Sequence, residues 1–112
     1  GRYMPPTVVD NTVVLNECGI KDIDLEWIDK KLGIKTRHIV RHLPLSDGQK
    51  ATEGQLNSDL CKMAIERALD SQGIKKSEID MLITATCTPD FLVPGQAAIV
   101  QEKLGMGECA TM

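Results

Sequence analysis

The sequence has few aromatic residues and no long apolar run. Tyr3, Trp27 and Phe91 are the only aromatics among 112 residues, so a core would have to be built from aliphatic side chains. No apolar stretch approaches the ~20 residues that a membrane-spanning helix needs, and no signal-peptide pattern opens the chain. The formal charge of −3 argues against general nucleic-acid binding. We therefore expect a cytoplasmic protein that binds neither membrane nor nucleic acid.

The cysteines lack the patterns of disulfide and metal sites. Cys18, Cys61, Cys87 and Cys109 include no CxxC pair, and no histidine stands at metal-ligand spacing. The composition predicts reduced, small, buried thiols and no metal site. Cys87 is a possible nucleophile because it follows a predicted strand. Pro89 blocks the immediate helix start that would lower a thiol pKa, so a structural role is favoured.

The clearest pattern in the sequence is a strand, a loop and a helix in residues 80–105. Met81–Thr86 is apolar and β-branched without alternation, which predicts a strand covered on both faces. After a proline-containing loop, Pro94 is expected just inside a helix that stops at Gly105. In α/β folds, ligands bind at loops that follow the carboxyl ends of strands. This loop is therefore a candidate binding region.

Capping residues and glycine stops predict three further helices. Their expected ranges are 12–18, 25–32 and 57 or 58 to 72. Residues 34–40 are expected to be extended, and residues 109–112 to begin a strand. The polar, turn-rich residues 43–54 predict an exposed loop with no domain boundary. The total is mixed α/β with too few strands for a complete sheet, which favours an incomplete domain.

Several segments of the chain resemble β-ketoacyl-acyl-carrier-protein synthase III, a thiolase-fold condensing enzyme. They occur in the family's order and are RYMPP, NTVVL, EWIDKKLGIKTRHI, SDLCKMAIERALDSQGI and ATCTPDFLVPGQAAIVQEKLG. The resemblance covers nearly the whole chain. It implies an α/β, thiolase-like fold, represented by a partial N-terminal half with a mixed sheet flanked by helices. Residues 1–112 would be an incomplete domain that lacks its first strand and everything from the nucleophile onward.

The resemblance also implies an acyltransferase activity in fatty-acid initiation. A cysteine would accept an acyl group from a thioester, and a carrier-protein- or CoA-bound malonyl-type extender would attack it. The reactive cysteine would lie beyond Met112, so no catalytic residue is expected within 1–112. The implied partners are acyl-CoA, acyl carrier protein and a second copy of the chain; coenzyme A thioester is a substrate, and no cofactor is permanently bound. The alternatives are a specialised secondary-metabolite relative, a non-catalytic acyl- or CoA-binding relative, and an unrelated small α/β domain.

Trp27 and Lys31 form the candidate site for coenzyme A or phosphopantetheine. They stand one helical turn apart within a basic group suited to phosphates, although a solvated basic face is the alternative. The basic group comprises Lys30, Lys31, Lys35, Arg37 and Arg41. By resemblance, the tryptophan and a basic residue four positions later bracket the adenine. The family has arginine at the position of Lys31, and an ammonium cannot stack as a guanidinium does. Delivery of the acyl group by a carrier protein therefore gains weight.

The loop before Pro94 contains an apolar run, Phe91–Val93. From the residues alone, this run could fill the protein's own core. By resemblance, the loop crosses a dimer interface, with Phe91 and Val93 belonging to the acyl-pocket and dimer loop. Val93 would then wall the partner's acyl pocket, and valine would leave more room there than an aromatic. His38, elsewhere in the chain, is expected to be a structural polar residue and not a base.

Overall fold

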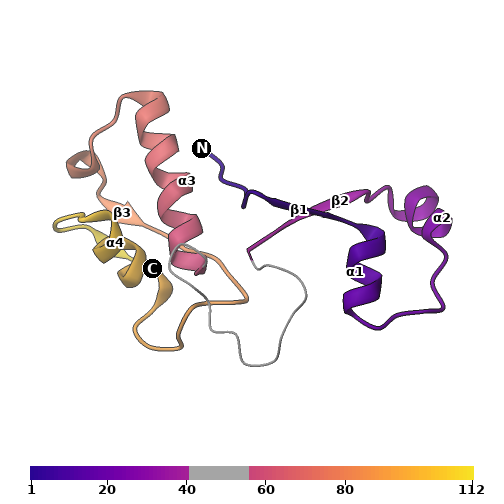
Figure 1. Ribbon diagram of the computed structural model, residues 1–112. Coiled ribbons are helices and arrows are strands. Elements are labelled where there is room, and N and C mark those ends of the chain that lie inside the picture. The colour runs from indigo at the N-terminus through magenta and orange to yellow at the C-terminus, as the bar shows by residue number, and fades with distance from the viewer. Residues whose placement is uncertain (41–55) are drawn as a thin grey trace. The chain divides into compact units, whose positions relative to one another are not determined.

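The computed structural model describes residues 1–40 and 56–112 (Figure 1). Contacts divide the chain into two compact units, Met4–Ala51 and Gly1–Tyr3 with Thr52–Met112. The expectation that no boundary lies within 43–54 is therefore wrong, because the division falls between residues 51 and 52. The exposed loop predicted for the same residues lies outside the described part of the chain.

In its described residues, the unit Met4–Ala51 contains a two-stranded antiparallel sheet, the helix α1 (Asn11–Glu17) and a second helical segment made of α2 (Leu25–Trp27) and the π-helix η1 (Ile28–Leu32). The strands of the sheet are β1 (Thr7–Asp10) and β2 (Thr36–Ile39). In the sheet, Thr7 lies opposite Ile39 and Asp10 opposite Thr36. The extended segment predicted for 34–40 is confirmed. Strand β1 was not predicted, since four residues give little pattern without the partner strand.

Short-range capping explains where the helices of this unit begin and end. Asp10 Oδ1 accepts a hydrogen bond from Val13 N at 2.9 Å, and Asp24 Oδ1 accepts one from Glu26 N at 2.9 Å. Gly33 ends η1 with a φ of 66°, a left-handed conformation that favours glycine. The helix predicted for residues 25–32 is confirmed as a helical segment, although its second part is a π-helix. Such π-turns often occur at functional sites.

The second unit packs two helices beside a short parallel strand pair. Its elements are α3 (Asn57–Gln72), the 3₁₀ turn η2 (Lys76–Glu78), β3 (Met81–Leu82), α4 (Gln96–Leu104) and β4 (Ala110–Thr111). Met81 lies opposite Ala110, and the hydrogen bonds continue beyond the paired residues, with Thr84 N donating to Met112 O at 2.8 Å. The long helix and the strand expected at 109–112 are both confirmed.

A small aliphatic core holds this second unit together. Val100 is wholly buried on α4 and packs with other buried residues of β3 and α4. The buried members are Leu82, Ala97, Val100 and Leu104, and the partly buried side chains against them are Cys61, Ile65, Met106 and Cys109. Because Cys61 and Ile65 belong to α3, the core joins both long helices to the strand.

The prediction that strand 81–86 is covered on both faces is wrong for this chain. Leu82 is buried, whereas Met81 is 51% and Ile83 63% exposed. Successive side chains of a strand point to opposite faces, and α4 packs on the face of Leu82. The regular strand is also shorter than expected, ending at Leu82. One apolar face of the strand pair is therefore open to solvent.

The predicted start of the following helix is also wrong. Pro94 precedes the helix instead of occupying its first turn, and the Val93–Pro94 peptide bond is cis. Gly95 is the N-cap and has an extended backbone, with φ −60° and ψ 149°. The helix can therefore begin only at Gln96. Its end at Gly105, with φ 62°, agrees with the prediction.

Candidate functional site

Trp27 and Lys31 lie on the helical segment α2–η1 of the unit Met4–Ala51. The Trp27 side chain is 51% exposed at the end of α2, and Lys31 is exposed one turn later in η1. The neighbouring Lys30 is engaged with Glu26 in an ion pair of 2.5 Å. Lys31 makes no hydrogen bond or ion pair with any residue in the described ranges 1–40 and 56–112. The indole and this ammonium are therefore both available to a ligand.

Among the residues that the structure describes, the other cations of the predicted basic group do not gather into a phosphate site. Arg37 Nη1 donates to Asn11 Oδ1 at 2.6 Å, and the buried Asn11 in turn donates through Nδ2 to Ile34 O at 2.7 Å. Arg37 therefore has a structural role in this unit. His38 Nδ1 lies 2.6 Å from Pro5 O, which confirms its prediction as a structural polar residue. Arg41 lies outside the described residues.

A cavity of about 320 Å³ lies between α1 and α2, close in sequence to the candidate pair. Its lining residues are Asp10, Asn11, Thr12, Leu25, Glu26, Asp29 and Lys35. Three carboxylates against one ammonium repel a pyrophosphate group. Trp27 and Lys31 do not line this cavity, so the candidate site is an exposed surface.

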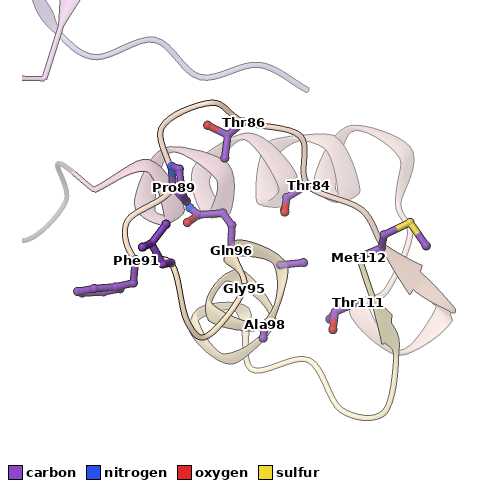
Figure 2. Close-up of a pocket in the computed structure, with 11 residues that line it drawn as sticks. Thr84, Thr86, Pro89, Phe91, Gly95, Gln96, Ala98, Thr111 and Met112 are labelled. Atoms are coloured by element: carbon purple, nitrogen blue, oxygen red, sulfur yellow. The ribbon is translucent and has the colours of Figure 1, made fainter.

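The loop between β3 and α4 forms the second candidate site, in the other unit. A cavity of about 400 Å³ opens where the carboxyl ends of β3 and β4 meet the start of α4 (Figure 2). The residues that line it are Thr84, Thr86, Pro89, Phe91, Leu92, Gly95, Gln96, Ala97, Ala98, Thr111 and Met112. This is the edge at which α/β sheets bind ligands, as the order of strand, loop and helix predicted.

The apolar run of the loop is left uncovered within its unit. Phe91 is 58%, Leu92 92% and Val93 86% exposed. The alternative that this run fills the protein's own core is therefore wrong for the described residues. Phe91 and Leu92 line the cavity, whereas Val93 does not. Exposed apolar side chains grouped in this way mark an interaction surface or a ligand-binding groove.

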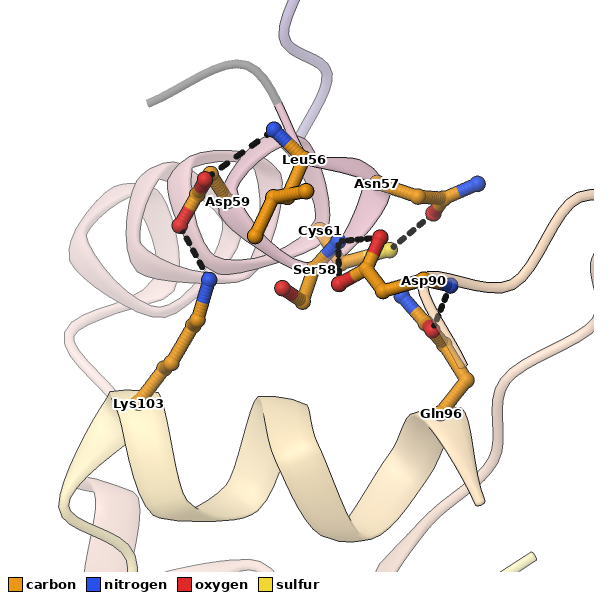
Figure 3. A network of polar contacts seen from close by, with 8 residues as sticks. All are labelled: Leu56, Asn57, Ser58, Asp59, Cys61, Asp90, Gln96 and Lys103. Atoms are coloured by element: carbon orange, nitrogen blue, oxygen red, sulfur yellow. Dashed lines mark hydrogen bonds and ion pairs between the residues drawn. The ribbon is translucent and has the colours of Figure 1, made fainter. Parts of the chain in front are cut away.

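A polar network, which the sequence did not reveal, fixes the base of this loop (Figure 3). The Asp90 carboxylate accepts from Ser58 N, with its two oxygens at 3.2 and 3.4 Å, and Asp90 N donates to Gln96 Oε1 at 2.9 Å. Asn57 Nδ2 donates to Thr88 O at 3.1 Å. The only sequence signal was indirect, because a leucine precedes the helix where a capping residue is usual.

The thiols differ from the expectation of buried cysteines. Cys18 and Cys87 are exposed, Cys61 and Cys109 are half-buried, and all four are free. Cys61 Sγ donates to Asn57 Oδ1 at 3.3 Å. Burial raises the pKa of the Cys61 thiol, and the nearby Asp90 carboxylate adds to this increase. The neutral thiol is therefore favoured in the folded state, which is unsuited to nucleophilic attack.

Residues 1–40 and 56–112 contain neither a cluster of metal-ligating side chains nor a membrane-spanning helix. Within these ranges, no three or more histidine, cysteine, aspartate or glutamate side chains gather as metal ligands. None of the helices described is sufficiently long and apolar to traverse a bilayer.

Solved structures define the class to which this fold corresponds. The chain matches the tetronic acid condensing enzyme AbyA1 with a TM-score of 0.76 and 31% identity, over 96% of this chain and 31% of the other. It matches 3-oxoacyl-(acyl carrier protein) synthase III from Pseudomonas aeruginosa PAO1 with a TM-score of 0.73 and 28% identity, over 98% and 29%. The fold thus corresponds to part of the thiolase-like fold of these condensing enzymes, as predicted.

Curated relatives found by sequence give a more specific similarity than the solved structures do. Beta-ketoacyl-[acyl-carrier-protein] synthase III of Laribacter hongkongensis is 39% identical over 106 residues, which are 95% of this chain. No family model matches the chain. The resemblance to synthase III inferred from the segments is therefore confirmed by sequence similarity across almost the whole chain. The chain spans about 29% of the length of the curated relatives it matches.

Proposed function

We propose that this chain forms part of an acyltransferase of the ketoacyl synthase III type. The observation that carries the proposal is 39% identity, over 95% of the chain, to a protein named beta-ketoacyl-[acyl-carrier-protein] synthase III. In this proposal, residues 1–112 are an incomplete N-terminal thiolase-like domain that lacks the first strand and everything from the nucleophile onward. The complete enzyme acts in the cytoplasm as a homodimer, without membrane or nucleic acid.

The proposed reaction has two covalent steps. A cysteine thiolate attacks the carbonyl carbon of an acyl thioester, so that a carbon–sulfur bond forms and the donor thiol leaves. A malonyl-type thioester then loses CO₂, and its carbanion attacks the acyl-enzyme carbonyl, which forms a carbon–carbon bond and releases the cysteine. Residues 1–112 supply none of these reacting groups. Their proposed contributions are a surface for the thioester carrier and a loop for the acyl pocket.

The test of this function uses the complete enzyme. Incubation with acyl-CoA is expected to add one acyl mass to a single cysteine-containing peptide, and later addition of malonyl-acyl carrier protein should yield the 3-oxoacyl product and CO₂. Intact-protein and peptide mass spectrometry follow both steps. If neither acyl-CoA nor acyl carrier protein donors acylate the protein, the non-catalytic alternative replaces this proposal.

A second candidate is a specialised condensing enzyme of secondary metabolism. It is favoured by the 31% identity and TM-score of 0.76 to a tetronic acid condensing enzyme. Both candidates use an acylated cysteine, so the donor and acceptor distinguish them. Acetyl transfer to malonyl-acyl carrier protein would support fatty-acid initiation, whereas turnover only with other donors or acceptors would support the specialised role.

Trp27 and Lys31 are proposed to bind the adenine end of coenzyme A. The half-exposed indole offers a stacking face, and the Lys31 ammonium, which has no partner within residues 1–40 and 56–112, offers positive charge to a phosphate. The acidic cavity beside α2 leaves the exposed surface as the favourable side for the phosphates. Because lysine lacks the planar guanidinium, only Trp27 would stack on the adenine ring. This weakness favours acyl carrier protein as an alternative donor.

Replacing Trp27 should mainly affect the binding of coenzyme A. Trp27→Ala is expected to raise KM for a coenzyme A thioester about tenfold, because stacking on a base contributes ~1–3 kcal/mol. The value of kcat should change less, since adenine is remote from the bond being made. Lys31→Arg should lower KM, with Lys30→Arg as the control because Lys30 is paired with Glu26. Steady-state kinetics measures all three variants; unchanged KM in both Trp27→Ala and Lys31→Arg would contradict the assignment.

A further inference from the structure

Helix α3 begins at an N-cap residue whose side chain cannot accept a hydrogen bond. Its N-cap is Leu56, which has no oxygen, although the first amide groups of a helix need acceptors. Asp59 accepts from Leu56 N at 3.1 Å, but this bond leaves the amide of Ser58, the second residue of the helix, to be satisfied. Ser58 is wholly buried, so its N–H cannot rely on bulk water. The acceptor comes from elsewhere in the chain.

Asp90 is that acceptor, 32 positions later in the sequence. Its carboxylate oxygens lie 3.2 and 3.4 Å from Ser58 N. A carboxylate at a helix N-terminus is favoured by the helix dipole as well as by hydrogen bonding. The contact therefore caps α3 and at the same time fastens the β3–α4 loop to that helix.

Three additional hydrogen bonds hold the same part of the loop. Asp90 N donates to Oε1 of Gln96, a buried residue at the start of α4. Asn57 Nδ2 donates to Thr86 Oγ1 at 3.0 Å and to Thr88 O at 3.1 Å. Figure 3 shows Asp90 between Ser58 and Gln96. The loop is thus fastened to both helices immediately before its exposed apolar run.

We propose that Asp90 is a positioning residue that sets the acyl-chain selectivity of the enzyme. Because Asp90 fixes the chain at residue 90, it holds Phe91–Val93 in one place. The distance to which Val93 reaches into the acyl pocket is then fixed as well. The inference rests on the proposed ketosynthase function and on the role of Val93 in the pocket. Displacement of a reacting or selecting group by about 1 Å can cost a hundredfold in rate.

The test compares variants that break the same helix start in different ways. Asp90→Ala removes the tie between loop and helix, Asp90→Asn retains an oxygen acceptor, and Asp59→Ala removes the cap on Leu56 and the ion pair with Lys103. For each variant of the complete enzyme, kcat/KM is measured over a series of acyl-CoA chain lengths. Asp90→Ala is expected to change the ratio between short and long chains about tenfold. Asp90→Asn should restore the ratio to within about twofold, and Asp59→Ala should lower the melting temperature with an unchanged ratio.

Amide exchange gives a readout that does not depend on activity. Peptides containing Ser58 and residues 86–95 should exchange faster in Asp90→Ala than in Asp90→Asn or Asp59→Ala. Equal chain-length ratios in Asp90→Ala and Asp59→Ala would overturn the positioning role. Unchanged amide exchange in Asp90→Ala would show that the Asp90 carboxylate does not hold the loop to α3. A wild-type protein that accepts no acyl group would refute the proposed function. The amide-exchange data would still show whether Asp90 holds the loop to Ser58.

Discussion

Residues 1–112 expressed alone are expected to show no cooperative thermal unfolding. In the described part of the chain, more large apolar side chains are exposed than buried. In the larger unit, Met81, Ile83 and Leu92 are open, while its buried aliphatic cluster is limited to one strand and one helix with α3 beside them. Each Å² of apolar surface left in water forgoes about 25 cal/mol. Such a small core cannot offset the ordering of the backbone.

Amide hydrogen exchange is the measurement that checks this expectation. Peptides that cover residues 81–86 should exchange at nearly the rate of an unfolded chain in the isolated polypeptide. The same peptides in the complete protein should be strongly protected, which provides the matched reference. Protection throughout 81–86 in a monomer of the isolated chain would contradict the inference of an incomplete domain. It would favour the alternative of an independent small α/β domain.

Val93→Phe is expected to shorten the range of acyl chains that the complete enzyme accepts. Val93 is 86% exposed in its own unit, so its proposed environment is the acyl pocket of a second copy. A phenylalanine there would fill the end of the pocket. Each methylene that no longer fits should cost ~0.8 kcal/mol, or roughly fourfold in kcat/KM. Acetyl transfer should survive, whereas longer acyl groups should be rejected progressively.

The control for this substitution lies outside the loop. Ile74→Phe places an aromatic on another apolar residue, which is 43% exposed and does not line the cavity beside the loop, and should leave the chain-length profile unchanged. Cysteine acylation is measured by mass spectrometry for wild type and both variants, over acyl-CoA donors of increasing length. Identical profiles for Val93→Phe and wild type would exclude Val93 as a pocket wall. The loop would then retain only a role in the interface.

The sequence by itself determined the features that depend on near neighbours. The sequence offered Asp10 or Asn11 for one helix start and Asp24 for another, because a capping side chain bonds to an amide two or three residues later. In the structure the caps are Asp10 and Asp24. Gly33, Gly73 and Gly105 identified helix ends because each takes a positive φ. The ordered segments also identified the synthase III resemblance, which the comparisons confirm. All of these signals are local patterns or their order along the chain.

Tertiary structure alone decided the features that join distant residues. The pairing of β1 with β2 brings Val9 opposite Arg37, and packing by α4 covers Leu82 while Ile83 stays exposed. The same is true of Asp90, whose carboxylate reaches Ser58 across 32 positions. No local pattern encodes these contacts, since hydrogen bonding and burial depend on which surfaces meet after folding. Leu56 cannot cap α3, and only the folded structure shows that the Asp90 carboxylate takes this role.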